Sequence, residues 1–204
     1  MLKLLWQHSI FPRAVRSLLC LASRSKISMS VLFLGATSRI SIAPRVTIGP
    51  RSRLKATEPG TIIIRAGVWI SSDVEIETEG TVTIGGGTTV QRRCTINGTV
   101  SLGRECILAP NVFISSGTHP FRVDPLLSIR EQERRIASGL LDFGEMVRPI
   151  TIGDDCWFGT NVVVCPGVVI GDSCVIGANS VVTRDLLAGG VYAGVPAIKI
   201  GDRR

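Results

Sequence analysis

Residues 152–182 read IGDDCWFGTNVVVCPGVVIGDSCVIGANSVV, and an apolar residue stands at every sixth position of this stretch. The same spacing runs through residues 84–114. Together the two runs comprise Ile84, Val90, Ile96, Leu102, Leu108, Ile114, Ile152, Phe158, Val164, Ile170, Ile176 and Val182. A period of six fits neither an amphipathic helix, with about 3.6 residues per turn, nor an uninterrupted strand, with a period of about two. It fits a chain that runs straight for one hexad, turns a corner and repeats, as in a β-helix.

A second regular position lies four residues after each apolar anchor and holds a small or β-branched residue. These residues are Thr88, Cys94, Val100, Cys106, Val112, Thr118, Cys156, Val162, Val168, Cys174 and Ser180. Because stacked hexads pair as parallel strands, both positions are expected to point into the interior. Residues 36–204 are therefore predicted to form one all-β solenoid, interrupted by an excursion at about residues 119–149. Within that excursion, Pro125–Ala137 is expected to form a short helix.

The charge of the chain is unevenly distributed. Residues 1–35 hold five basic residues and no acidic one, whereas the remaining chain holds 18 basic and 16 acidic residues. A nearly neutral solenoid argues against a nucleic-acid-binding protein. Residues 1–35 are predicted to form a separate basic, amphipathic and helical segment. It is expected either to lie on an anionic membrane surface or to pack on the first coils or on a neighbouring subunit.

Four of the six cysteines fall at the small interior position, namely Cys94, Cys106, Cys156 and Cys174. The cysteines do not show the C-x-x-C spacing of zinc ligands. A buried free cysteine behaves as a small hydrophobic residue, and free thiols persist in a reducing compartment. The sequence therefore favours a cytoplasmic protein without a metal site, with attachment to the cytoplasmic face of a membrane through residues 1–35 as an open alternative.

Several short motifs follow one another in a characteristic order. They are Leu108-Ala109-Pro110-Asn111-Val112, Thr118-His119-Pro120, Gly144-Glu145-Met146, Trp157-Phe158-Gly159 and Ala193-Gly194-Val195-Pro196-Ala197. In this order they resemble the hexapeptide-repeat O-acetyltransferases, which include galactoside, maltose and polysaccharide-biosynthesis acetyltransferases. The resemblance covers roughly residues 84–200. It implies a left-handed parallel β-helix, a homotrimer with sites between neighbouring solenoids, and acetyl-CoA as the donor along the C-terminal coils.

Acetyl transfer to a hydroxyl requires a base, and histidine, with an unperturbed pKa near ~6.5, is suited to that role. The chain contains two histidines, His8 and His119. The resemblance implies that His119 is the catalytic base, because it lies in the Thr-His-Pro motif. It also implies that Glu145, in the Gly-Glu-Met motif, is the carboxylate that assists the base.

The resemblance implies binding residues as well. For the donor they are Trp157, Thr160, Ala178, Thr183, Arg184 and Lys199, and for the acceptor they are Asn97 and Thr89. The chain departs from the family pattern at its end, where Ile198 replaces the basic residue that usually follows Pro-Ala and Lys199 comes one position later. The long excursion is expected either to recognise the acceptor or to brace a trimer.

The expected function is acetyl-CoA-dependent O-acetylation of a sugar or glycan hydroxyl. One alternative is an antibiotic hydroxyl as the acceptor, and another is a non-catalytic assembly scaffold. Zinc carbonic anhydrases share this fold but need three histidines at each metal site. A trimer that supplies only His119 from each solenoid does not readily build such sites.

Overall fold

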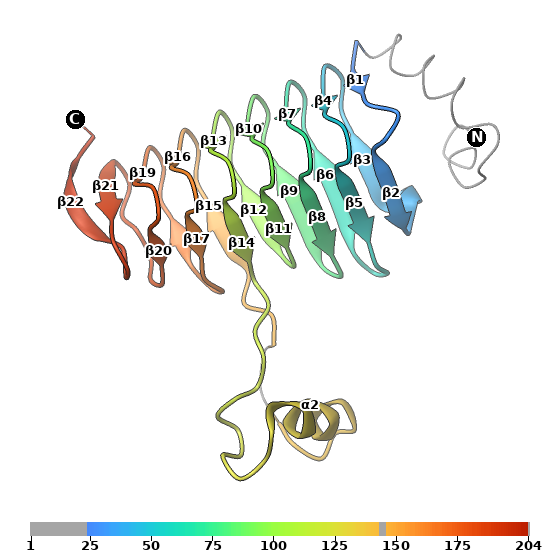
Figure 1. The fold of residues 1–204 in the computed structure, drawn as a ribbon, viewed down its shortest axis with the longest axis vertical. Coiled ribbons are helices and arrows are strands. Elements are labelled where there is room, and N and C mark those ends of the chain that lie inside the picture. Colours follow the sequence, from blue (N-terminus) through green and yellow to red (C-terminus); the bar gives the residue numbers. More distant parts are fainter. Residues whose placement is uncertain (1–23, 143–145, 204) are drawn as a thin grey trace.

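The computed structural model describes residues 24–142 and 146–203. Most of them form a β-solenoid whose coils stack along one axis (Figure 1). Three sheets make its faces, and strands β1 to β20 visit them in turn along the chain. Their strands pair in parallel, except that the last strand, β22, pairs antiparallel with β21. The solenoid and the hexapeptide repeat predicted from the sequence are thus confirmed.

The sheets contain nine, seven and six strands and are called sheets A, B and C. Sheet A comprises β1 (Lys26–Ile27), β4 (Thr47–Ile48), β7 (Trp69–Ile70), β10 (Thr89–Val90), β13 (Ile107–Leu108), β16 (Trp157–Phe158), β19 (Val175–Ile176), β21 (Gly190–Ala193) and β22 (Ile198–Asp202). Sheet B comprises β2 (Leu32–Gly35), β5 (Arg53–Ala56), β8 (Glu75–Thr78), β11 (Thr95–Asn97), β14 (Phe113–Ser115), β17 (Val163–Val164) and β20 (Val181–Val182). Sheet C comprises β3 (Ile40–Ile42), β6 (Thr61–Ile64), β9 (Thr81–Ile84), β12 (Val100–Leu102), β15 (Ile150–Ile152) and β18 (Val169–Ile170).

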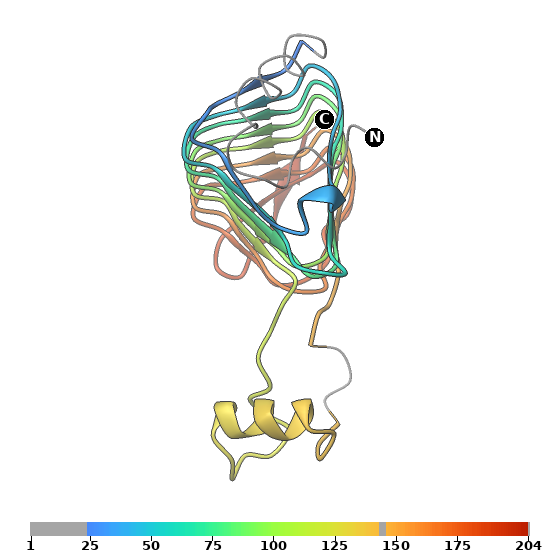
Figure 2. The same cartoon turned by 90° about the vertical axis from the view of Figure 1, so that its right-hand side faces the viewer.

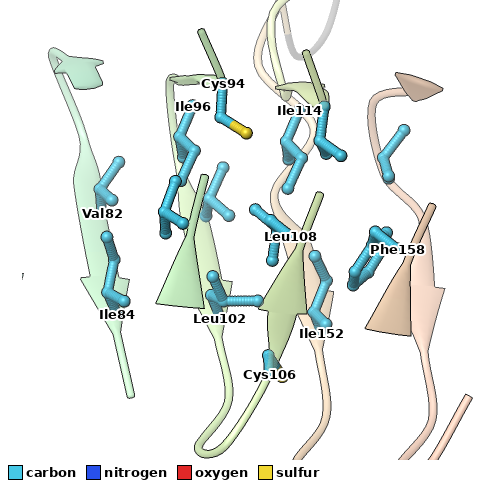
Figure 3. Packing of buried hydrophobic residues seen from close by; sticks show 14 of the residues in the cluster. Val82, Ile84, Cys94, Ile96, Leu102, Cys106, Leu108, Ile114, Ile152 and Phe158 are labelled. Carbon is cyan, nitrogen blue, oxygen red and sulfur yellow. The ribbon is translucent and has the colours of Figure 1, made fainter. Parts of the chain in front are cut away.

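The apolar anchors stack on one another because the strands pair in register. Val90, for example, lies opposite Ile70 on one side and Leu108 on the other. All twelve anchors are at most 2% exposed, and Figure 3 shows several of them filling the interior. Burying a large aliphatic side chain stabilises a fold by about 1.5–3 kcal/mol, so the stacked anchors are the main source of solenoid stability.

The small second positions are buried as expected, with one exception. Thr118 is only half-buried, and Ser116 takes the interior place in that coil with an exposure of 0%. The chain leaves the solenoid directly after Ser116, so Thr118 already belongs to the excursion. The four cysteines at second positions are buried and free.

The solenoid begins earlier than predicted, and the expectation of a helical segment reaching residue 35 is wrong for residues 24–35. Strands β1 and β2 lie in this range and pair with β4 and β5. The hexad spacing continues here through Ile27 and Phe33, and Val31, four residues after Ile27, is buried. The remainder of the predicted segment, residues 1–23, lies outside the described residues.

The excursion is an arm formed by residues 116–149, between the end of β14 and the start of β15. It hangs from the corner between sheets B and C and carries helix α2 (Ile129–Ala137) at its far end (Figure 2). The expected helix is present but starts four residues later than Pro125, because Ser128 is its N-cap and accepts a hydrogen bond from the Glu131 amide. A short 3₁₀ turn, η2 (Thr37–Arg39), precedes β3.

Candidate functional site

His119 lies at the base of the arm, four residues after β14 ends. The two chain segments that leave and re-enter the solenoid run side by side here. Thr118 donates its amide hydrogen to the Met146 carbonyl, at 3.1 Å, and Arg148 donates to the Ser116 carbonyl, at 2.9 Å. These contacts define a neck, residues 116–118 and 146–148, which fixes the backbone next to His119. The His119 side chain itself is 71% exposed.

The nearest described carboxylate contact of His119 comes from helix α2. The Glu133 Oε1 atom lies 2.6 Å from His119 Nδ1, and Arg130 Nη1 lies 3.0 Å from Glu133 Oε2. The hydrogen bond with His119 is the main reason why the pKa of the Glu133 carboxyl lies below its ordinary value of 4.5. Arg130 adds to this effect, and partial burial opposes it. Sequence reasoning missed this contact, because spacing alone does not reveal that a helix folds back onto His119.

The carboxylate that the sequence favours, Glu145, lies outside the described residues. Its predicted assistance to His119 therefore stays a prediction.

Trp157 projects from the outer face of sheet A and is 52% exposed. In neighbouring strands it lies opposite Ile107 and Val175, and Ile107 in turn lies opposite Thr89. Trp157 and Thr89 are thus two strand spacings apart on one face, or about 10 Å. An apolar strip with an exposed indole therefore runs along this face, parallel to the solenoid axis.

The other predicted donor residues lie toward the C-terminal coils. Thr160 is half-buried, and its carbonyl accepts a hydrogen bond from the Asn179 amide at 2.8 Å. Ala178, Thr183 and Arg184 are exposed. Lys199 is exposed too, and its ammonium group forms an ion pair with the Asp202 carboxylate at 2.6 Å.

A single chain does not bring the predicted site residues together. The arm that carries His119 leaves the solenoid between sheets B and C (Figure 2), whereas Trp157 and Thr89 lie on the third face, sheet A. Asn97 lies on sheet B, in register with Ser115 at the start of the arm, and is thus the predicted acceptor residue on the His119 side. Within one chain, His119 and the apolar strip around Trp157 therefore lie on different sides of the solenoid.

Two kinds of chemistry, metal binding and thiol reactivity, find little support in the described residues. Within residues 24–142 and 146–203, histidine, cysteine and acidic side chains do not form a group of three or more arranged around a metal ion. Burial raises the pKa of the Cys94 thiol to about 11, so this side chain is a neutral thiol in the core. In the same part of the chain, the helix is too short to cross a membrane.

These features define a hexapeptide-repeat β-solenoid with a histidine-bearing arm. Residues 149–184 match the family described as the hexapeptide repeat of succinyl-transferase. Galactoside O-acetyltransferase of Escherichia coli (strain K12) is 37% identical over 99 residues, which are 48% of this chain and 41% of that protein. WcaF of the same organism, assigned to colanic acid biosynthesis as an acetyltransferase, is 28% identical over 153 residues, 75% of this chain and 65% of WcaF. The chain therefore contains a hexapeptide repeat and is similar, over part of its length, to acetyltransferases that carry this repeat.

The chain spans less than half the length of galactoside O-acetyltransferase and about two thirds of WcaF. Among solved structures, a complex of the N-acyltransferase AntD from Bacillus cereus with a dTDP-amino sugar and coenzyme A superimposes with a TM-score of 0.52. It shares 18% identity, over 93% of this chain and 89% of AntD. UDP-N-acetylglucosamine acyltransferase from Campylobacter jejuni gives a TM-score of 0.56 at 14% identity, over 88% and 73% of the two chains. At such identities these structures show a shared fold.

Proposed function

We propose that the protein transfers the acetyl group of acetyl-CoA to a hydroxyl of a sugar or glycan, with His119 as the general base. The observation that carries the proposal is the placement of His119, which stands exposed at the neck with Nδ1 held by a carboxylate. The second ring nitrogen, Nε2, is then the proton acceptor. It takes the proton of the acceptor hydroxyl as the oxygen attacks the thioester carbon, and it returns a proton to the departing thiolate.

The donor is proposed to lie along the aromatic strip toward the C-terminal coils. Trp157 offers an apolar wall for the acyl and pantetheine portion. Toward the C-terminal coils, the proposed donor site is lined by Thr160, Ala178 and Thr183. Arg184 is proposed to contact the nucleotide phosphates, with Lys199 in a lesser role because of its ion pair with Asp202. For the acceptor, Asn97 and Thr89 are proposed as contacts, and Glu145 is proposed to assist the base.

The site is proposed to form between copies of the chain, in a homotrimer. The support is topological, since His119 and the Trp157 face point away from each other within one protomer. In a trimer, the His119 of one copy can face the Trp157 strip of the next. Residues 1–23 are the part that we propose for contact with an anionic membrane surface, on the basis of their basic and apolar residues.

The first experiment is calorimetric titration of the purified protein with acetyl-CoA, using wild-type protein, Trp157→Ala and His119→Ala. Wild-type protein is expected to bind about one donor per chain. Trp157→Ala should weaken binding, whereas His119→Ala should retain it, because His119 handles the hydroxyl proton rather than the donor.

Acceptors are then screened by mass spectrometry, with saccharides and hydroxyl-bearing antibiotics in separate panels. His119→Ala is expected to lower turnover by about 10²–10⁴-fold, the scale for loss of a general base. Acetylation of antibiotics alone would correct the acceptor class. Failure to bind acetyl-CoA in all three proteins would favour the non-catalytic scaffold.

A further inference from the structure

Helix α2 is fastened to the arm by one buried polar side chain. Gln132 is 1% exposed, and its Oε1 atom accepts hydrogen bonds from the amides of Val123, at 3.1 Å, and Asp124, at 3.3 Å. Its Nε2 group donates to the Leu127 carbonyl at 3.1 Å. Three hydrogen bonds from one side chain set the rotation of α2 relative to residues 123–127. The next residue of the helix, Glu133, is oriented by the same contacts.

Glu133 is held at both of its oxygens. Oε1 meets His119 and Oε2 meets Arg130, and the side chain is 20% exposed, far less than the 71% of His119. A carboxylate fixed in this way keeps its position while the exposed imidazole meets a substrate. The surrounding contacts therefore place the rigid partner on α2 and the reactive ring at the neck.

We propose that Glu133 is the positioning residue of His119, which selects its ring tautomer and stabilises its protonated form during acetyl transfer. The proposal rests on the proposed function. Its basis is the 2.6 Å contact between Nδ1 and Oε1 together with the anchoring of α2 by Gln132.

The contact between His119 and Glu133 determines which ring nitrogen of His119 carries the hydrogen. An ionised carboxylate can only accept hydrogen bonds, so Nδ1 of His119 carries the hydrogen and Nε2 of the neutral ring carries the lone pair. The lowered pKa of the Glu133 carboxyl agrees with an ionised partner. With the other tautomer, the exposed Nε2 would already hold a proton and could not take one from a hydroxyl. After proton transfer, the adjacent negative charge stabilises the imidazolium.

The test compares Glu133→Ala and Glu133→Gln with Glu131→Gln in the full-length protein. Glu131 is a matched control, since it is on the same helix and pairs with two arginines, Arg134 and Arg135, rather than with His119. The first readout is the ¹⁵N spectrum of the histidine rings, which distinguishes the two tautomers. The chain holds two histidines, and a His8→Gln variant assigns the signals.

Wild-type protein and Glu131→Gln are expected to show the Nδ1–H tautomer at His119, and Glu133→Ala is expected to lose it. In the acetylation assay, Glu133→Ala should lower kcat/KM, but by less than the about 10²–10⁴-fold expected for His119→Ala, because the base remains but is poorly oriented. Glu133→Gln keeps the size of the side chain and removes its charge, so it should fall between Glu133→Ala and wild type.

The proposal is overturned if Glu133→Ala keeps the wild-type ring signals and turnover, or if Glu145→Gln changes the tautomer and Glu133→Ala does not. Far-ultraviolet circular dichroism identifies a variant that is misfolded, and Glu133→Gln then decides the question in its place. Absence of acetyl transfer in wild-type protein would contradict the proposed function, while the tautomer comparison would still report on Glu133.

Discussion

In the solenoid, the environment of a side chain is set by its place in the hexad, whereas in the arm it is set by individual polar contacts. Residues of the same type illustrate the difference. Phe158, an anchor of β16, is fully buried, whereas Phe121, near the start of the arm, is 54% exposed and has the Arg122 guanidinium over its ring at 4.9 Å. The solenoid buries its apolar side chains at the same position of every coil, whereas the contacts of the arm occur only once in the structure.

The two regions also differ in what they can do. A solenoid coil is constrained by the coils on both sides, so its interior cannot accommodate a titrating group without cost. The arm leaves that stack and can place an exposed histidine beside an ionised carboxylate, as it does with His119 and Glu133. The buried core and the exposed His119–Glu133 pair thus lie in different regions of the chain, and substitutions in one region should leave the fold of the other largely unchanged.

Removing the arm is the strongest test of this separation. We expect replacement of residues 121–142 by a short Gly-Ser linker to lower acetyl transfer more than Glu133→Ala does, and at most as far as His119→Ala, about 10²–10⁴-fold. The reason is that it removes the contacts that orient His119. The solenoid should stay folded, because the neck hydrogen bonds of Thr118 and Arg148 remain. Circular dichroism and acetyl-CoA titration check this, and loss of the β signal would show that the solenoid depends on the arm.

The opposite test perturbs the solenoid alone. Phe158→Ala should lower the free energy of unfolding by about 3–5 kcal/mol, since it leaves a cavity among stacked anchors. The control is Phe113→Ala, also in a strand but 41% exposed on the outer face, which should lose under about 1.5 kcal/mol. Urea unfolding measures both. Equal losses would mean that the hexad position does not determine the energetic weight of a side chain.

The difference between the regions also explains how far the sequence predicts the structure. The spacing of anchors such as Leu102 and Ile152 predicts strands, register and core, because the repeat imposes one environment at every sixth position. It even extends to Ile27 and Phe33, although the basic charges nearby favoured a separate helical segment. A repeat can be recognised in a single sequence, because every further coil shows the same spacing of apolar residues and so supports the same assignment.

The candidate site is only partly predictable for the same reason. The Thr-His-Pro motif indicates His119, and the helix near residues 125–137 follows from local sequence. The pairing of His119 with Glu133 depends on the rotation of helix α2 about its axis. Gln132 fixes this rotation through three hydrogen bonds, and this set of contacts does not recur in the arm's described residues. Contacts between non-repeating segments leave little periodic signal in a sequence.

A third prediction concerns the arm alone. Gln132→Ala leaves the amides of Val123 and Asp124 and the Leu127 carbonyl without their partner, which should favour opening of the arm by about 1–3 kcal/mol. Hydrogen exchange should accelerate at Val123 and Asp124 and stay unchanged in the solenoid strands. Arg134→Ala, exposed on the same helix, is the control and should change exchange little. Faster exchange throughout the solenoid would show that the regions are coupled.

The smallest effect on stability is expected for the contact between the two coils that lie directly before and after the arm. Arg104, in the coil before the arm, donates to Asp154, in the coil after it, from Nε at 3.0 Å and from Nη2 at 2.6 Å. These hydrogen bonds lower the pKa of the Asp154 carboxyl below its ordinary value of 3.8. A carboxyl whose pKa is lower in the folded state stabilises the fold above its unfolded pKa, and this contribution is lost as the pH falls through the folded value.

Asp154→Asn should therefore unfold at a slightly lower urea concentration than wild type at neutral pH, and the gap should close below about pH 3.8 as the wild-type carboxyl is protonated. The gap should also shrink in about 1 M salt, where screening acts over roughly 3 Å, because both side chains are substantially exposed. A gap that persists in acid and in salt would mean that the contribution of Asp154 does not come from its charge, and that asparagine replaces it poorly as the acceptor of the hydrogen bond that the Arg104 backbone amide donates to Oδ1, at 2.7 Å. In that case the Asp154 side chain would join the two coils as a hydrogen-bond acceptor, and its ion pair with Arg104 would add little to the stability of the solenoid.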